Sequence, residues 1–90
     1  KKMEIHPLIG QLGRLHTTEL GEQRIRRNLG LDTGDAVEHC RTLIRDRRCV
    51  ICRRGKNWYC RLDGVTVTVN AQSLTVITAH REGRQRRPVW

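Results

Sequence analysis

The clearest pattern in the chain is a change of hydrophobic period near residue 49. Before that point, apolar residues recur at the three- to four-residue spacing of helices. After it, apolar and polar side chains alternate, as in strands that bury one face. Helices followed by strands predict an α+β domain, with two to three N-terminal helices packed on a four-stranded antiparallel β-meander.

Three helices are predicted from apolar stripes and end signals. The first spans residues 7–15, opens on Pro7 and is weakened by two glycines. The second begins at Thr17 or Thr18, runs to about Asn28 and stops at Gly30. The third follows the capping stretch 32–35, and its apolar stripe consists of Ala36, Val37, Cys40, Leu43 and Ile44.

Four strands are predicted in the second half of the chain. Their ranges are residues 49–53, 57–62, 65–70 and 73–79. Asp63-Gly64 is a strong signal for a two-residue hairpin turn. Trp58, Cys60 and Leu62 share one side of the second strand. We assign residues 1–81 to a single domain and predict that the basic tail, residues 82–90, is mobile.

The net charge of +9 indicates which kind of partner the protein binds. Residues 1–45 hold eight Lys/Arg against six Asp/Glu, whereas residues 46–90 hold ten against three. Most of these cations are Arg, whose planar guanidinium matches phosphate oxygens in pairs. RNA or another nucleic acid is therefore the expected partner; a merely solubilising surface is the alternative. No apolar run is long enough to span a membrane, so we expect a cytoplasmic protein without a membrane partner.

The four cysteines leave three interpretations open. Cys49 and Cys52 have the CxxC spacing of many zinc sites, but Val50 and Ile51 between them favour a strand, on which they would face opposite sides. We expect all four to be buried, unbridged hydrophobes, with zinc binding and redox chemistry as the alternatives. No cofactor and no metal site is predicted.

Candidate catalytic residues follow from the scarcity of carboxylates in the predicted sheet, which argues against a metal-dependent nuclease. Metal-free RNA cleavage needs a base, an acid and groups that stabilise the phosphorane charge. We expect His16 at the start of the second helix and His80 at the end of the last strand to flank one phosphate, with Thr78 and Arg24 assisting. In this interpretation Thr78 and His80 face a polar cleft beside the start of the second helix.

The candidate nucleic-acid-binding residues lie in the second and third predicted strands and in the turn that precedes the second. Cations and hydrogen-bond donors there can contact phosphates, and one aromatic ring can stack on a base. Ordinary turn and edge chemistry is the plain alternative for each of them. The residues are Arg54, Lys56, Asn57, Tyr59, Arg61 and Asn70.

Several segments resemble a family of uncharacterised bacterial proteins. The opening motif is residues 15–21, LHTTELG, followed by Arg24-Ile25 and Asn28-Leu29. Residues 54–59, RGKNWY, and residues 76–80, VITAH, continue the resemblance, which covers roughly residues 8–81. The family carries no activity that could be transferred.

A more distant resemblance, in pattern alone, is to the barnase-, colicin- and RelE-like ribonuclease toxins. It implies helices on a four-stranded antiparallel sheet and metal-free RNA cleavage, with His16, Arg24 and Thr78 at matching positions. Our leading expectation is accordingly a small toxin-type RNA endonuclease, with a cognate acidic inhibitor protein as a further partner. The alternatives are a non-catalytic nucleic-acid-binding module and a structural or phage-defence interaction protein.

Overall fold

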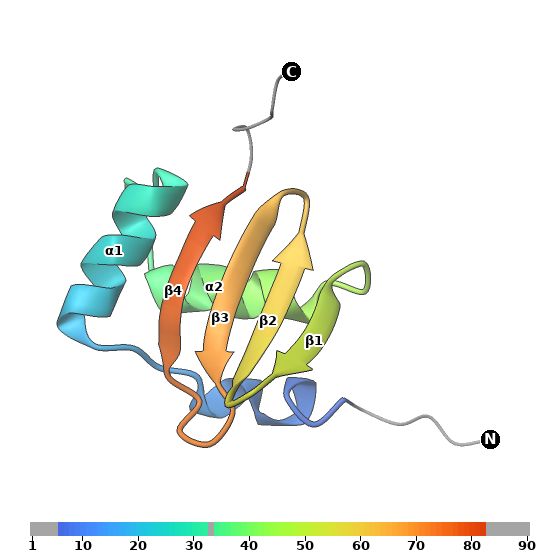
Figure 1. The fold of residues 1–90 in the computed structure, drawn as a ribbon. Helices are drawn as coiled ribbons and strands as arrows, with labels where there is room; N and C mark the ends of the chain where they lie inside the picture. The colour runs from blue at the N-terminus through green and yellow to red at the C-terminus, as the bar shows by residue number, and fades with distance from the viewer. Residues whose placement is uncertain (1–5, 33, 83–90) are drawn as a thin grey trace.

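The computed structural model describes residues 6–32 and 34–82. A 3₁₀ helix and two α-helices come first, and a four-stranded antiparallel sheet follows in the order β1-β2-β3-β4 (Figure 1). The elements are η1 (Ile9–Arg14), α1 (Glu19–Leu29), α2 (Ala36–Arg45), β1 (Val50–Arg54), β2 (Asn57–Leu62), β3 (Val65–Asn70) and β4 (Val76–Arg81). The predicted α+β class and its antiparallel meander are confirmed.

Both α-helices begin, and α1 also ends, at signals in the sequence. Thr18 caps α1 by accepting a hydrogen bond from the Gly21 amide, and Gly30 ends it in the left-handed conformation. Asp35 caps α2 by accepting from the amides of Val37 and Glu38. Local chemistry therefore fixes both bounds of α1 and the start of α2.

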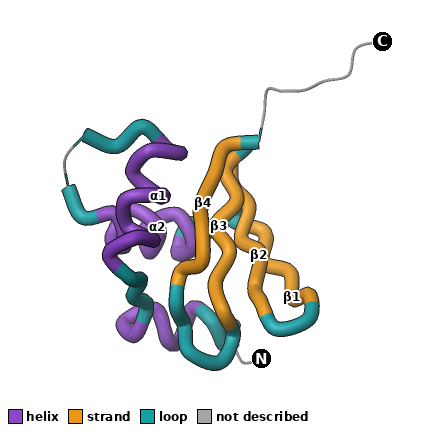
Figure 2. The backbone as a smooth tube through the Cα atoms, turned by 60° about the vertical axis from the view of Figure 1, so that its left-hand side comes forward, coloured by secondary structure: helices purple, strands orange, loops and turns teal. Residues whose placement is uncertain are grey.

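The helices lie on one side of the sheet. α2 crosses behind the strands in Figure 1, whereas α1 runs along the outer edge of β4, and Figure 2 shows both helices on the same side of the strands. Two side chains bond carbonyls on that edge: Thr17, just before α1, donates to Val76 at 2.8 Å, and Asn28 in α1 donates to Ala79 at 3.1 Å. The helix thereby covers an edge that would otherwise be open for pairing.

Alternation along the strands divides the sheet into two faces. The helix-facing side carries the core residues of β2, β3 and β4, all buried. They pack with the apolar stripes of the helices into one cluster. From the sheet, these are Cys60, Val65, Val67, Val69, Val76 and Ala79.

Two elements differ from the prediction by more than one residue at an end. The first helix is a 3₁₀ helix over residues 9–14, kinked at Gln11, as its glycines allow. β4 begins at Val76 rather than at residue 73, because Leu74 takes a positive φ of 61° and its buried side chain belongs to the loop. The strand then continues through Arg81, so that His80 does not end it.

The cysteine prediction is correct in part. Cys40, Cys49, Cys52 and Cys60 are all free, and Cys40 and Cys60 are buried. Cys49 is only half-buried and Cys52 is exposed, because alternation along β1 turns Cys52 away from the core. The predicted mobility of the tail lies almost wholly outside the described residues, since only Glu82 of that tail is described.

Candidate nucleic-acid interface

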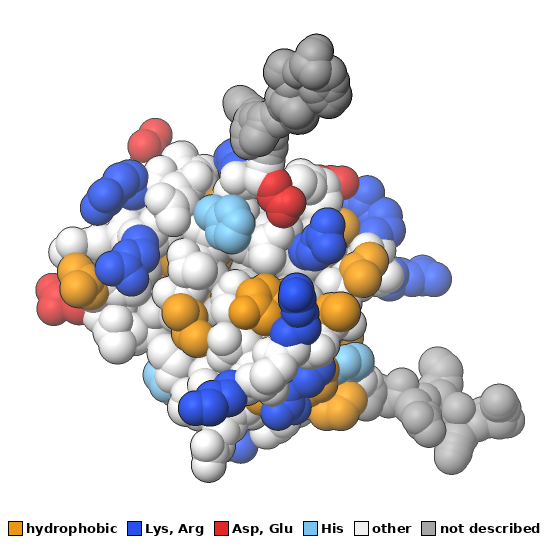
Figure 3. Space-filling model, in the orientation of Figure 1, with side chains coloured by type: hydrophobic (Ala, Val, Ile, Leu, Met, Phe, Trp, Pro, Cys, Tyr) orange, Lys and Arg blue, Asp and Glu red, His pale blue; other side chains and the backbone are white. Residues whose placement is uncertain are grey.

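The sheet face turned away from the helices, here called the open face, gathers most of the predicted binding residues. Residues paired directly across antiparallel strands point to the same side, so the strand register defines its rows. One row is Cys52, Tyr59, Thr68 and Thr78; the next is Val50, Arg61, Thr66 and His80; Arg54, Asn57 and Asn70 form a third. Figure 3 shows this side of the molecule, where Lys and Arg side chains alternate with hydrophobic ones.

Tyr59 lies in the middle row of the open face and is half-buried. The guanidinium of Arg54 lies 5.9 Å from the centroid of its ring. Trp58, the next residue, points to the helix side, where it contacts His6 with a ring separation of 4.8 Å. The open face therefore offers an aromatic ring with a cation over it, a cation–π pair in which both groups can contact a nucleobase.

A polar cluster occupies the end of the open face nearest the β2–β3 turn. The Thr66 hydroxyl donates a 2.8 Å hydrogen bond to the Glu82 carboxylate. Thr66 is flanked in register by Arg61 on β2 and His80 on β4. His80 and Glu82 are two residues apart and thus share a side. Thr66 thus has a cation, an imidazole and a carboxylate as its neighbours on the open face.

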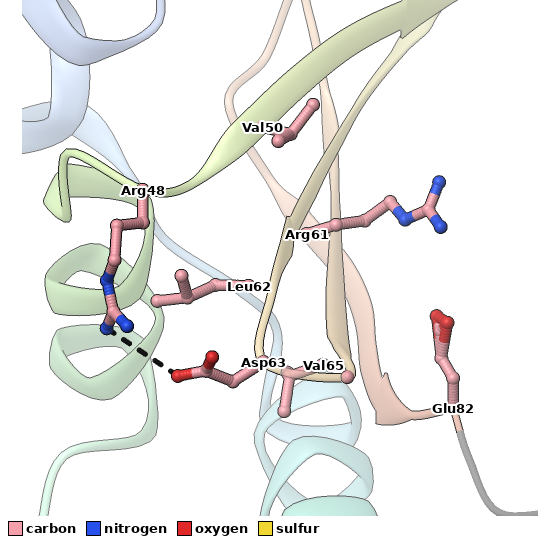
Figure 4. A pocket seen from close by; sticks show the side chains of 8 residues that line it. Arg48, Val50, Arg61, Leu62, Asp63, Val65 and Glu82 are labelled. Atoms are coloured by element: carbon pink, nitrogen blue, oxygen red, sulfur yellow. Dashed lines mark ion pairs between the residues drawn. The ribbon is translucent and has the colours of Figure 1, made fainter.

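A hollow of about 460 Å³ borders this polar cluster. Arg61 and Glu82 project to one side of the β2–β3 hairpin, while Arg48 and Asp63 form a 3.6 Å ion pair on its other side (Figure 4). Among the ion pairs of the described residues, none joins Arg61 to Glu82.

His16 and His80 do not come together. His16 pairs with Thr75, just before β4, and its Nε2 lies 3.1 Å from the Thr75 hydroxyl. His80 lies five residues further along, or roughly 16 Å at the rise of an extended strand. The end of α1 that lies nearest His80 is the C-terminal one, since Asn28 bonds Ala79 and Arg81 bonds the Leu29 carbonyl. A cleft between His80 and the start of α1 is therefore not formed.

Arg24 and Thr78 lie between the two ends of β4, near which His16 and His80 are placed. Arg24 is exposed and lies one helical turn before Asn28, on the stripe of α1 that follows β4. Thr78 is half-buried beside Thr68 in the middle row. Thr78 is therefore part of the open face, whereas Arg24 lies on the helix beside β4, and the hydrogen bonds of His16 involve neither of them.

The remaining predicted binding residues lie at the opposite end of the sheet from the polar cluster. Lys56 is exposed in the β1–β2 turn, beside a hollow of about 270 Å³ that Asn70 also lines. The Asn70 Oδ1 accepts from the amides of Gln72 and Ser73, so Asn70 shapes the following turn. The Asn57 Oδ1 is buried and has no partner within the described structure.

Glu82 is the candidate functional residue that sequence reasoning missed. It is assigned to the tail from the sequence, although the period-two alternation that begins at Thr78, after the bulge opposite Thr68 and Val69, continues through it. Its amide donates to the Gly64 carbonyl, which ties it to the β2–β3 turn. Extending the strand pattern by two residues from His80 would have identified it.

Metal and membrane sites can be checked within the described ranges. Across residues 6–32 and 34–82, no three His, Cys, Asp or Glu side chains gather in a way that could hold a metal ion. In the same ranges, every helix is too short or too polar to cross a bilayer.

Comparison with known proteins identifies the family. The chain belongs to the family described as "Protein of unknown function (DUF3781)", whose model matches residues 9–80. Neither the curated proteins nor the solved structures include a match to the chain. The family match covers η1, both α-helices, the first three strands and β4 as far as His80, and ends two residues before Glu82.

Proposed function

We propose that this protein binds single-stranded RNA on the open face of its sheet. The observation that carries the proposal is the position of Tyr59, half-buried at the centre of that face, with Arg54 beside its ring and Arg61 two residues along the same strand. A stacking ring between two cations suits successive bases and their phosphates.

The distribution of charge also supports RNA binding on the open face. Among the described residues whose side chains lie on the open face, Glu82 is the only acid. Asp63 in the adjoining β2–β3 turn is paired with Arg48, and the acids of α1 and α2 lie elsewhere. A single strand fits better than a duplex, because a duplex keeps its bases stacked on each other and would leave Tyr59 without a partner.

The test is fluorescence anisotropy with a labelled single-stranded RNA over a range of salt concentrations. Tyr59→Ala should weaken binding about tenfold or more, while Tyr59→Phe keeps the ring and most of the affinity. Arg61→Ala should also lower the slope of log affinity against log salt by about 0.7.

Arg45→Ala is the matched control for Arg61→Ala. It removes the same charge from α2, on the other side of the sheet, where Arg45 lies exposed near Glu38. Equal losses for Arg45→Ala and Arg61→Ala would show that net charge alone attracts RNA. That result would contradict a specific interface on the open face.

RNA cleavage at the polar cluster is a second candidate function, favoured by the contact of Thr66 with Glu82 beside His80. In this proposal the Glu82 carboxylate takes the proton of a ribose 2′-OH, whose oxygen then attacks the adjacent phosphorus. The His80 imidazolium gives a proton to the departing 5′-oxygen, and Arg61 offsets the charge that develops on the phosphoryl oxygens. A cyclic phosphate and a free 5′-hydroxyl result.

Cleavage is tested with the same RNA in the presence of a chelator. His80→Ala and Glu82→Gln should each lower the cleavage rate by ~10²-fold or more, with binding retained. Glu38→Gln removes the same charge from α2 and should cleave like the parent chain. If the parent chain binds but never cleaves, the catalytic proposal fails and the binding proposal stands.

The compartment and a further partner belong to the same proposal. Four free cysteines suit the reducing cytoplasm. An acidic protein could cover the basic open face and thereby compete with RNA, which is how a cognate inhibitor of a toxin-type enzyme would act. Salt-sensitive competition between such a protein and RNA is the expected signature.

A further inference from the structure

Two cysteines meet between α2 and the first two strands. Cys60 in β2 pairs with Ile51 in β1, and its side chain is fully buried. Cys49 precedes Ile51 by two residues, so its side chain lies on the same face of the sheet, where it packs against the core and remains half-buried. One thiol is thus reachable from solvent and the other is shielded behind it.

The strand register and the shared packing against the core bring the Cys49 and Cys60 side chains to the same part of the sheet. The interaction with the Cys60 thiol lowers the pKa of Cys49, against the opposing effects of partial burial and the nearby Asp46 carboxylate. The same interaction, together with burial, raises the pKa of Cys60. The half-buried sulfur is therefore the one that more readily becomes a thiolate, the nucleophilic form.

We propose that Cys49 and Cys60 form a peroxide-sensitive thiol pair that closes to an intramolecular disulfide. This site is independent of RNA binding, because it lies on the opposite face of the sheet from Tyr59. Cys49 is the residue attacked by the oxidant, and Cys60 is the residue that resolves the product.

The reaction balances with one hydroperoxide as oxidant. The Cys49 thiolate attacks a peroxide oxygen, the O–O bond breaks, and the sulfur is oxidised to a sulfenic acid while hydroxide or an alkoxide leaves. The Cys60 sulfur then attacks the Cys49 sulfur, the S–O bond breaks, and the Cys60 proton leaves with the hydroxyl as water. Two electrons pass from the two thiols to the peroxide, and a thiol reductant reverses the change.

The backbone can accommodate the bond with a small movement. Diagonal neighbours in an antiparallel pair have Cα atoms about 7–8 Å apart, whereas disulfides span about 4.4–6.8 Å. Cys49 lies just before β1, in the turn where its amide bonds the Asp46 carbonyl, rather than inside the strand ladder. A shift of about 1 Å in this turn brings the pair into range.

Cys52 provides an internal comparison. It is exposed on the open face, opposite Tyr59, and is more accessible than Cys49. Accessibility alone would therefore make Cys52 the first thiol to be oxidised. Cys49 shares the core side of the sheet with Cys60, whereas Cys52 lies on the other side, so we expect Cys49 to be the one that forms an intramolecular bond.

The experiment treats the reduced full chain with equimolar hydrogen peroxide, alkylates the remaining thiols and maps the peptides by mass spectrometry. The expected result is the loss of two of the four alkylatable thiols, recovery of a Cys49–Cys60 linked peptide, and full reversal by dithiothreitol. Cys52→Ser should give the same linked peptide. In Cys60→Ser, Cys49 should remain as a sulfenic acid that a dimedone probe captures.

Two outcomes would overturn the proposal. One is oxidation of Cys52 while Cys49 and Cys60 stay alkylatable; the other is a bond between any pair except Cys49 and Cys60. The linked-peptide measurement uses the parent chain, so it decides the matter even if burial at position 60 prevents Cys60→Ser from folding.

Discussion

Asn28 in α1 donates a 3.1 Å hydrogen bond from Nδ2 to the backbone carbonyl of Ala79 in β4. Thr17, before the start of the same helix, bonds the Val76 carbonyl at 2.8 Å, so helix and strand run in the same direction side by side. This alignment decides which residues can cooperate. It places the C-terminal end of α1 near His80 and leaves His16 at the other end of β4.

Replacing Asn28 tests how strongly this bond holds helix and strand together. Asn28→Ala should lower the free energy of unfolding by about 1 kcal/mol, because the Ala79 carbonyl loses its side-chain donor. Chemical denaturation measures the change. Gln23→Ala, at an exposed position of the same helix, should change stability by less than about 0.5 kcal/mol. Equal losses at both positions would argue against the role of the bond.

Gly21 should resist a substitution that normally stabilises helices. A Cβ at this buried position would lie 2.3 Å from the Thr17 hydroxyl oxygen, which is held by its bond to Val76. Gly21→Ala is therefore expected to destabilise the protein by about 1–3 kcal/mol, whereas Gly→Ala in an unobstructed helix gains about 1 kcal/mol. Thermal unfolding would show the difference.

Gly13→Ala is the matched control for Gly21→Ala. No atom lies within 4 Å of a Cβ built there, and its φ is not positive, so stability should be unchanged or slightly raised. Adding Thr17→Ala to Gly21→Ala should cost less than the sum of the two single changes, because the clashing hydroxyl is gone. Strict additivity would speak against the steric explanation.

Because Cys40 is buried, the free energy of unfolding should vary with pH in the alkaline range. Desolvation raises the pKa of this thiol to about 11, from an ordinary value of 9.0. The folded state thus holds the proton more tightly than the unfolded state. The contribution of the Cys40 thiol to the free energy of unfolding is complete below about pH 9 and is lost as the pH rises through about 11. The loss lowers the free energy of unfolding by about 2–3 kcal/mol.

Denaturation curves from about pH 8 to about 11 measure this effect. Cys40→Ala should lose part of the alkaline decrease, with the remainder coming from Cys60, whose pKa is also raised. Cys52→Ala removes an exposed thiol and should follow the parent chain. An identical decrease in Cys40→Ala and the parent would refute the assignment.

Local signals predicted most of the fold. Thr18, Gly30 and Asp35 fixed the helix ends, and β2 and β3 have the predicted bounds because Asp63-Gly64 sets the turn between them. Both turn residues take positive φ, as a type I′ hairpin requires. The predicted start of β4 was wrong. Leu74 has a positive φ, its side chain is buried in the core, and its carbonyl accepts a hydrogen bond from the His16 amide. The alternation of apolar and polar residues reveals none of these features.

The candidate site was predictable only as far as one strand specifies it. Alternation put Tyr59 and Arg61 on one face and Trp58 on the other, as the structure confirms. Whether His16 and His80 come together depends on the direction of α1 relative to β4. That direction is set by contacts between residues more than fifty positions apart in the sequence. Helix periodicity contains no such information.

The central claim is that RNA binds the open face. Its most direct test is to titrate an unlabelled single-stranded RNA into ¹⁵N-labelled protein and follow amide chemical shifts. The account predicts saturable, salt-sensitive shifts concentrated at Tyr59, Arg61 and Thr68 and their strand neighbours, with the amides of α2 unchanged. Shifts concentrated on α2, or none at concentrations that saturate binding in anisotropy, would contradict it.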